Sequence, residues 1–260
     1  MFVWMGRSSN IVKLKVSSRE LFKVKDMEAS SSRKLRVGIF SLSSCEGCLV
    51  EILGIEDVFM DLLELIEVSD SRLLGVKEGE GNLDVAIVEG AVITSEDRSK
   101  LEKIRRKSKI LVALGDCACY GGKFIMKDFD GKEVNSQPLE NFVKVDYKIY
   151  GCPATRENFV KFMKHMLISR SFEEPSINVC GECLLRGAEC LLEKGILCLG
   201  PITRAGCNAL CPSVNSPCIG CRGLSMDANL KAFLEILEKK GISIPPYLAK
   251  LAEKTCKEER

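Results

Sequence analysis

Short apolar segments alternate with amphipathic segments along the first two thirds of the chain. The apolar segments predict strands over Leu35–Phe40, Asp84–Val88, Ile110–Leu114 and Val145–Tyr150. The amphipathic segments have apolar residues three or four positions apart, and they predict helices over Cys48–Leu63, from Thr94 to about Lys107, and over Arg156–Leu167. Strands that alternate with helices in this way predict an α/β fold, in which a parallel sheet carries helices on its faces.

Two of these helices are preceded by residues that can cap them. Ser43 or Ser44 stands ahead of the first helix, and Thr94 ahead of the second. Their hydroxyl oxygens can accept hydrogen bonds from the free N–H groups of a first helical turn. Glu96 and Asp97 add negative charge near the start of the second helix, where the helix dipole favours it.

The pattern changes from about Phe172, and Pro175 marks a break. The stretch Cys180–Cys221 is dense in cysteine and glycine and has few apolar residues, so we expect bound metal to contribute much of its folding energy. An amphipathic helix is predicted over Asp227–Lys240, and Pro245 and Pro246 are expected to end the ordered core. The predicted divisions are an N-terminal extension (1–33), an α/β domain (34–171), a cysteine-rich region (172–226), and a C-terminal helix with a charged tail (227–260).

Composition excludes several classes of protein. The net charge of +2 over 260 residues gives no reason to expect a nucleic acid or an acidic membrane as partner. No apolar run of the length of a membrane span occurs, and we see no export signal, so a cytoplasmic protein is expected. The only histidine, His165, lies on a predicted helix and is interpreted as a packing or surface residue.

Fourteen cysteines are the outstanding feature of the composition. A disulfide scaffold is one explanation, but such scaffolds are short, secreted and poor in core residues. This chain is 46% hydrophobic, which is enough for a sizeable core. In a reducing compartment, clustered cysteines are more typical of metal ligands.

Four of the cysteines follow the predicted strands: Cys45 and Cys48 the first, Cys117 the third and Cys152 the fourth. The carboxyl ends of parallel strands share one edge of a sheet, so these thiols are expected to meet there as one ligand set. A thioredoxin-like redox pair is the alternative for Cys45 and Cys48, but such a pair needs no further cysteines at other strand ends.

Eight more cysteines form the second group. They are Cys180, Cys183, Cys190, Cys198, Cys207, Cys211, Cys218 and Cys221. Thiolates in sets of four suit iron–sulfur clusters, and they also suit structural zinc, so spacing leaves both open. Twelve ligands would leave Cys119 as a packing residue and Cys256 as incidental. No phosphate-binding loop and no dinucleotide fingerprint occurs.

Taken together, the motifs resemble the small subunit of nickel–iron hydrogenases. They are Cys45-Glu46-Gly47-Cys48, Glu89-Gly90-Ala91-Val92, Gly115-Asp116-Cys117-Ala118-Cys119-Tyr120-Gly121-Gly122, Gly151-Cys152-Pro153, Cys198-Leu199-Gly200-Pro201-Ile202-Thr203 and Pro217-Cys218-Ile219-Gly220-Cys221. The resemblance covers roughly residues 35 to 225. It implies a flavodoxin-like N-terminal domain, and it favours iron–sulfur clusters over zinc.

The resemblance also implies a division of the ligands. Cys45, Cys48, Cys117 and Cys152 would hold a cluster proximal to the nickel–iron centre, which belongs to a separate large subunit. The medial cluster would be held by Cys207, Cys211, Cys218 and Cys221, and the distal one by Cys180, Cys183, Cys190 and Cys198. With four thiolates at each site, three 4Fe-4S clusters are expected, and no nickel, flavin or nucleotide in this chain.

Departures from the periplasmic members point to one branch of the family. Those members have a histidine in place of Cys180 and no counterpart of Cys211. This chain resembles the cytosolic methyl-viologen-reducing, deazaflavin-reducing and sulfhydrogenase-type enzymes. The implied partners are a nickel–iron large subunit and a further subunit that carries flavin or iron–sulfur clusters.

Two other functions stay open at this point. One is the equivalent subunit of a complex I-related oxidoreductase, although that relative has adjacent cysteines where this chain has Cys45 and Cys48 two residues apart. The other is an interaction protein stabilised by zinc, without a redox role.

Overall fold

The structure is a computed structural model, and it describes residues 34–54, 62–71, 74–76, 81–122, 134–168, 170–249 and 251. The predicted N-terminal extension, the middle of the first predicted helix and Cys256 lie outside these ranges. Within the described residues, none of the helices has the length and hydropathy needed to cross a bilayer.

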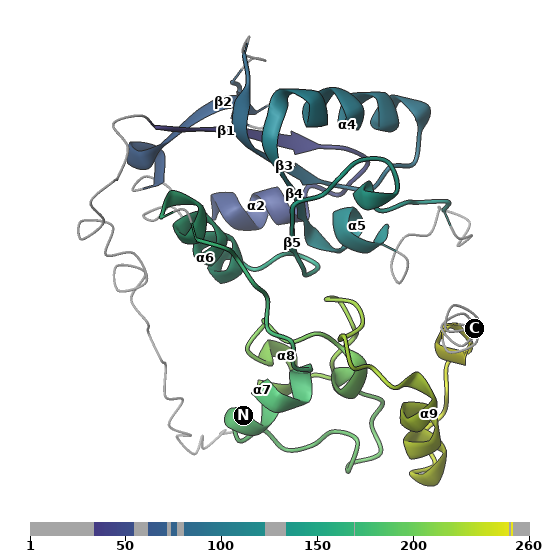
Figure 1. The fold of residues 1–260 in the computed structure, drawn as a ribbon. Helices are drawn as coiled ribbons and strands as arrows, with labels where there is room; N and C mark the ends of the chain where they lie inside the picture. Colours follow the sequence, from purple (N-terminus) through teal and green to yellow (C-terminus); the bar gives the residue numbers. More distant parts are fainter. Residues whose placement is uncertain are drawn as a thin grey trace, which may run out of the picture.

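A five-stranded parallel sheet forms the first part of the molecule (Figure 1). Its strands are β1 (Leu35–Ser41), β2 (Ile66–Ser71), β3 (Leu83–Glu89), β4 (Ser108–Leu114) and β5 (Tyr147–Ile149). They lie in the order β2-β1-β3-β4-β5, which is the flavodoxin-like order. The four predicted strands and the α/β class are confirmed. The edge strand β2 was not predicted, because Glu67 and Ser69 interrupt its short apolar pattern.

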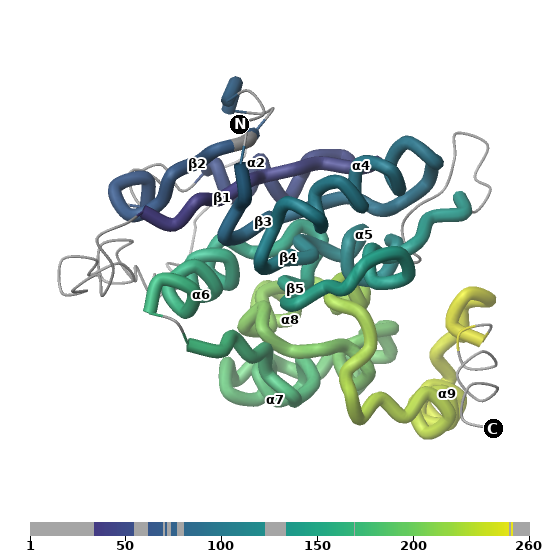
Figure 2. The backbone as a smooth tube through the Cα atoms, turned by 45° about the horizontal axis from the view of Figure 1, so that its top comes forward, coloured from purple at the N-terminus to yellow at the C-terminus, as the bar shows by residue number. Residues whose placement is uncertain are grey.

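Helices cover both faces of the sheet, and further helices follow it. The α-helices are α2 (Gly47–Leu53), α4 (Ser95–Lys107), α5 (Gly115–Tyr120), α6 (Arg156–Leu167), α7 (Val179–Leu185), α8 (Leu210–Ser213) and α9 (Leu230–Lys239), with 3₁₀ turns η2 (Leu139–Asn141) and η3 (Gly200–Ile202). Figure 2 shows the cysteine-rich segments with α7 and α8 below the sheet layer.

Alternation along the strands produces two separate cores, one on each face of the sheet. In β3, Val85 and Ile87 face the core that α2 and α6 cover, whereas Ala86 and Val88 face the core that α4 and α5 cover. The central strands are therefore apolar on both faces, as expected for a buried parallel sheet. The sheet is a rigid support for the residues at its carboxyl edge.

The two predicted helix caps have different outcomes. Thr94 caps α4 in a capping box with Asp97, as predicted. The prediction for Ser43 or Ser44 is wrong, because the residue ahead of α2 is Glu46, which has a left-handed backbone and no side-chain cap. The Ser44 hydroxyl instead donates to Glu89 at 2.9 Å, which ties the α2 entry to the end of β3.

The cysteine-rich region has a hydrophobic core of its own, contrary to the expectation that apolar residues are scarce there. Val179, Leu199 and Ile202 pack with Phe233 and Leu237 of α9. The amphipathic helix is thus confirmed, and its start three residues later than predicted reflects capping by Asn229. The core also extends beyond Pro245 and Pro246, since Leu248 is fully buried within it. The predicted division of the chain into segments stays a prediction.

Candidate iron–sulfur sites

The four cysteines that were predicted to meet do lie at the carboxyl edge of the sheet. Cys45 and Cys48 belong to the turn after β1 and the start of α2. Cys117 lies on α5, directly after β4, and Cys152 follows β5. We call Cys45, Cys48, Cys117 and Cys152 the sheet-edge set.

Backbone packs closely against one sulfur of this set. Gly115 has a φ of +85°, and a Cβ built on it would lie 2.4 Å from the Sγ of Cys48. The backbone N–H of Ala154 donates to the same sulfur over 3.4 Å. Only glycine leaves room for the Cys48 sulfur at the start of α5. Backbone packed this closely around the Cys48 sulfur fixes its position, as expected for a sulfur that binds a metal centre.

Burial and mutual repulsion raise the pKa values of Cys48, Cys117 and Cys152. Burial raises the pKa of Cys48 to about 12, and the charges of Glu89, Cys117 and Cys152 add to the rise. Burial likewise raises the pKa of Cys117 to about 12 and that of Cys152 to about 11. The thiolate charges of the set raise one another's pKa, so deprotonation of all four thiols requires a bound cation to offset their charge.

Two buried carboxyl groups stand beside the set, and sequence reasoning gave neither a role. Glu89 is 1% exposed and accepts hydrogen bonds from the N–H of Leu49 at 3.0 Å and from Ser44. Asp116 is 2% exposed, and neither of its carboxylate oxygens has a hydrogen-bond partner among the described residues. Burial raises the pKa of Asp116 to about 6. The available signal was an acidic residue at or near the carboxyl end of a buried strand.

A second set lines one cavity in the cysteine-rich region. Cys180, Cys183, Cys190 and Cys198 all contribute to its wall, together with apolar Leu191 and Leu192. A Cβ on Gly200 would lie 3.3 Å from the Sγ of Cys180 and 3.6 Å from that of Cys198. We call these four cysteines the cavity set.

The remaining four cysteines, Cys207, Cys211, Cys218 and Cys221, interact with one another, and we call them the loop set. The charge of Cys207 acts on Cys211, that of Cys211 on Cys221, and that of Cys221 on Cys218, and the charge of Cys198 from the cavity set also acts on Cys211 and Cys218. Burial raises the pKa of Cys218 to about 12, against a hydrogen bond from the N–H of Gly220. The division of these eight cysteines into two ligand sets, which the family resemblance implies, stays a prediction.

A backbone N–H of one set faces a sulfur of the next set at both junctions. The N–H of Cys152, in the sheet-edge set, lies near enough to the sulfur of Cys221 in the loop set to oppose the rise that burial causes in its pKa. The N–H of Cys218, in the loop set, donates to the Sγ of Cys198 in the cavity set at 3.3 Å. The three sets are thus in contact in series, and the loop set lies in the middle.

The donor chemistry of the twelve thiols fits iron–sulfur clusters. All thirteen described cysteines are free thiols, so a disulfide scaffold is excluded for them. Sulfur ligands with backbone N–H donors aimed at them are typical of iron–sulfur sites. Among the described residues, no group of three or more ligating side chains is arranged around a single metal ion. The buried Cys119 donates to the carbonyl oxygens of Ala113 and Ile149, as expected for a packing residue.

His165, on α6, is not part of these sets. Its ring lies edge-on to Phe172, and its Nδ1 is 2.7 Å from the carbonyl oxygen of Ser171. This agrees with the interpretation of His165 as a packing residue.

Comparison with known proteins places the chain in a family. It is 36% identical over 222 residues to the sulfhydrogenase 2 subunit delta of Pyrococcus furiosus, a match that spans 79% of this chain and 93% of that protein. The chain belongs to the family of nickel–iron hydrogenase small subunits. It is also 29% identical over 268 residues to one subunit of the F420-non-reducing hydrogenase vhu of Methanocaldococcus jannaschii, covering 84% of this chain and 93% of that protein.

Two further comparisons extend this result. The profile of the family described as NADH ubiquinone oxidoreductase, 20 Kd subunit, matches residues 45–166 of this small subunit, which contain the whole sheet-edge set. The structure of the [NiFeSe]-hydrogenase of Dm. baculatum superposes with a TM-score of 0.56 at 20% identity, over 75% of this chain and 96% of that chain. At that identity, the structural likeness supports the fold alone.

Proposed function

We propose that this small subunit relays electrons, one at a time, between a nickel–iron site in a partner large subunit and a further subunit that carries flavin or iron–sulfur clusters. Each of the three cysteine sets would hold one 4Fe-4S cluster: the sheet-edge set the proximal, the loop set the medial and the cavity set the distal cluster. Bound clusters of this kind exchange electrons at potentials that depend on charge, hydrogen bonding and burial around the sulfurs. The chain supplies that environment.

The serial contact of the three sets is the observation that carries this proposal. Cys152 and Cys221 connect the first set to the second, and Cys218 and Cys198 connect the second to the third. A protein that used the cysteines only to stabilise its fold would have no need for such a series. Electron transfer needs short steps between successive centres, and this order of sets provides them.

The protein also controls the surroundings of several ligand sulfurs. The N–H groups of Ala154, Cys218 and Gly220 point at ligand sulfurs, where they stabilise negative charge and so raise the reduction potential. Burial of Cys48 and Cys218 keeps water away, which lowers the potential. The balance of the two effects sets the potential of each step.

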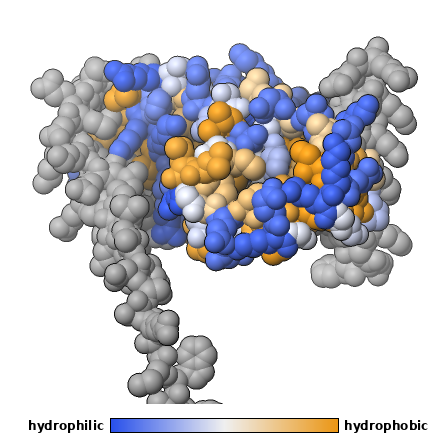
Figure 3. Space-filling view, turned by 90° about the horizontal axis from the view of Figure 1, so that it is seen from below, coloured by the Kyte–Doolittle hydropathy of each residue, from blue (hydrophilic) through white to orange (hydrophobic). Residues whose placement is uncertain are grey.

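Exposed residues beside the cysteine sets provide places for partners. Cys45 of the sheet-edge set, Cys190 of the cavity set and Cys211 of the loop set are exposed in this chain. Leu184 and Leu185 on α7, next to the cavity set, are 78% and 88% exposed. Figure 3 shows hydrophobic side chains gathered among charged ones on the face that looks away from the sheet. Apolar surface of this kind is typical of protein–protein contacts, which supports a subunit of a larger complex.

The sheet-edge assignment is tested by Cys152→Ser in the assembled hydrogenase. This change removes one thiolate from the set but keeps the backbone N–H that faces Cys221, so hydrogen-dependent dye reduction should fall at least tenfold through damage to the proximal cluster. The matched control is Cys119→Ala, which removes a nearby buried thiol outside the three sets and should retain near-normal activity. Electron paramagnetic resonance should show one altered cluster signal in the first variant only. Full activity of Cys152→Ser with all signals unchanged would contradict the assignment.

The match to the family profile also supports one alternative function, that of the equivalent subunit of a complex I-related oxidoreductase. The two functions differ in the partner chain. A complex isolated through a tag on this chain should contain stoichiometric nickel if the partner is a hydrogenase large subunit. A stable complex without nickel and without hydrogen uptake would favour the alternative.

A further inference from the structure

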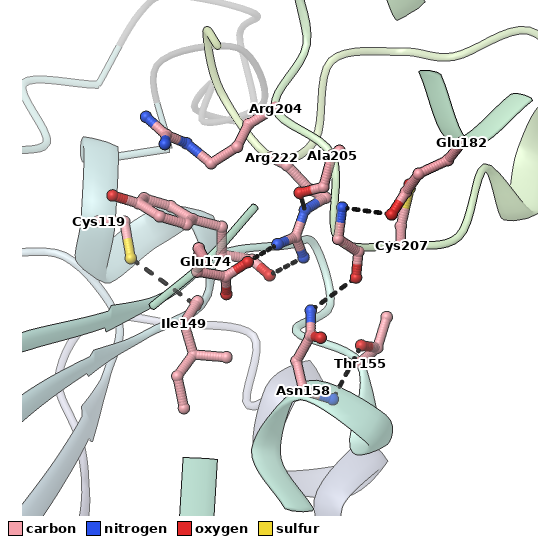
Figure 4. Close-up of polar contacts among 12 residues, drawn as sticks. Cys119, Ile149, Thr155, Asn158, Glu174, Glu182, Arg204, Ala205, Cys207 and Arg222 are labelled. Atoms are coloured by element: carbon pink, nitrogen blue, oxygen red, sulfur yellow. Dashed lines mark hydrogen bonds and ion pairs between the residues drawn. The ribbon is translucent and has the colours of Figure 1, made fainter. Parts of the chain in front are cut away.

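A buried arginine joins the sheet to the cysteine-rich region. Arg222 directly follows the last cysteine of the loop set and is 1% exposed. Its Nε donates to the carbonyl oxygen of Ala205 at 2.8 Å and its Nη1 to that of Tyr150 at 2.7 Å. Its Nη2 donates to the carboxylate of Glu174 (Figure 4). All three nitrogens of the guanidinium therefore donate hydrogen bonds, each to a different residue.

The partners of Arg222 connect it to two cysteine sets. Tyr150 stands two residues before Cys152 of the sheet-edge set, and Ala205 two residues before Cys207 of the loop set. One rigid, planar group thus holds the backbone that leads into both sets. Gly206 packs directly against it, since a Cβ there would lie 2.3 Å from the Nη2 of Arg222. Any shift of one set relative to the other would break these hydrogen bonds.

The charge of Arg222 acts mainly on the loop set. Arg222 is the residue next to Cys221, and its Nε is hydrogen-bonded to the carbonyl oxygen of Ala205, two residues before Cys207, so its charge lies beside both of these thiols. The charges that act on Cys152 are those of Asp116, Cys221 and Cys45. A buried positive charge beside two ligand sulfurs favours the more negative, reduced state of whatever centre those sulfurs hold.

Glu174 balances the arginine from the other side. Its side chain is 8% exposed, and its charge acts on Tyr150 and on Cys119, which belong to the sheet. A buried charge is costly unless it is paired, so the two side chains are expected to depend on each other for burial. Because the carboxylate is on the sheet side, it offsets only part of the arginine charge at the loop set.

We propose that Arg222 is a positioning residue that fixes the loop set against the sheet-edge set, and that its buried charge raises the reduction potential of the cluster held by the loop set. This inference deepens the proposed function and rests on it. It also gives the Arg222–Glu174 pair a role beyond stability, because neutralising Glu174 alone should raise the potential whereas neutralising both residues should lower it.

The test is a redox titration of the complex, followed by electron paramagnetic resonance, in a series of variants. Arg222→Gln combined with Glu174→Gln removes both charges without stranding either, and the medial potential should fall. Glu174→Gln alone leaves the arginine charge less balanced, and the medial potential should rise. Arg222→Lys retains the positive charge, so its medial potential should stay much closer to the wild-type value than that of the double variant. Arg186→Gln is the matched control, because it removes an exposed charge that is hydrogen-bonded to Asn208 near the same set.

The outcomes separate this inference from the proposed function. Wild-type complex without three iron–sulfur signals would contradict the proposed function itself. Three signals in the wild type, with a medial potential in Glu174→Gln or in the double variant that equals that of Arg186→Gln, would overturn the inference. If one variant loses its medial cluster, the medial potential is measured in the remaining variants. A shift of that potential opposite to the one expected, or no shift, overturns the inference.

Discussion

At the scale of single residues, the structure shows how backbone makes room for sulfur. Gly115 illustrates it, because the Cys48 sulfur occupies the space that a side chain would need. The sequence indicated that glycines accompany the cysteines, but not which glycine is indispensable. That depends on the contact between residues far apart in the chain, which becomes visible only when α2 and α5 are placed at the same sheet edge.

Gly115→Ala should therefore disrupt the sheet-edge set. The new methyl group would overlap the Cys48 sulfur, and the left-handed backbone adds about 1–2 kcal/mol of strain. Iron content should fall by about four atoms, the number in one cubane. Gly195→Ala is the matched control, because Gly195 has a φ of +73° but no atom within 4 Å of an added Cβ. Equal iron loss in both variants would show that strain, rather than the sulfur contact, is responsible.

Other residues of the site were beyond the reach of sequence reasoning. Arg222 and Glu174 are 48 residues apart, and nothing in the local pattern pairs them. The cysteines could be predicted as ligands from the sequence, because clustered cysteines have few other roles and because parallel strands bring their carboxyl ends together. A buried ion pair gives no such signal, since arginine and glutamate are common on any surface.

At the scale of elements, the helix and strand pattern was largely predictable. Apolar runs gave β1, β3, β4 and β5, and periodicity gave α4, α6 and α9 close to their observed bounds. The missed elements are short ones, such as β2, α7 and α8, whose formation depends on docking against neighbours more than on local pattern. The entry to α2 was also mispredicted, because Ser44 bonds across the sheet edge to Glu89.

The cap of α4 gives a prediction at this scale. Asp97 accepts hydrogen bonds from the N–H groups of Thr94 and Ile93 and from the Ser43 hydroxyl. Asp97→Ala should lower the free energy of unfolding by about 1 kcal/mol at pH 7, the usual value of a lost cap. Lys103→Ala, at an exposed position of the same helix, is the control and should change it by less than about 0.5 kcal/mol. Urea unfolding followed by circular dichroism measures both.

The pH dependence of this effect has a definite sign. Burial would raise the pKa of Asp97, but the hydrogen bonds from Thr94, Ser43 and Ile93 outweigh it and hold the pKa below its usual range. The stabilisation is therefore fully present above the unfolded-state pKa of about 3.9, and it is lost as pH falls through the lower folded-state value. A penalty for Asp97→Ala that already vanished between pH 8 and pH 5 would contradict this assignment.

At the scale of the whole molecule, the chain consists of a sheet with two cores and a cysteine-rich region with a third. The third core was not foreseen, because its apolar residues are spread among cysteines and glycines and reach as far as Leu248. The sheet positions one cysteine set, the third core positions the other two, and Arg222 holds the parts together. The series of sulfur contacts follows from that arrangement.

The central claim is that three tetrads of thiols hold iron, and the most direct measurement is metal and sulfide analysis of the chain purified without oxygen. The account predicts a brown protein with about twelve irons and about twelve inorganic sulfides, four of each per cluster, and no stoichiometric zinc. A colourless protein that carries zinc at the same cysteines would contradict it.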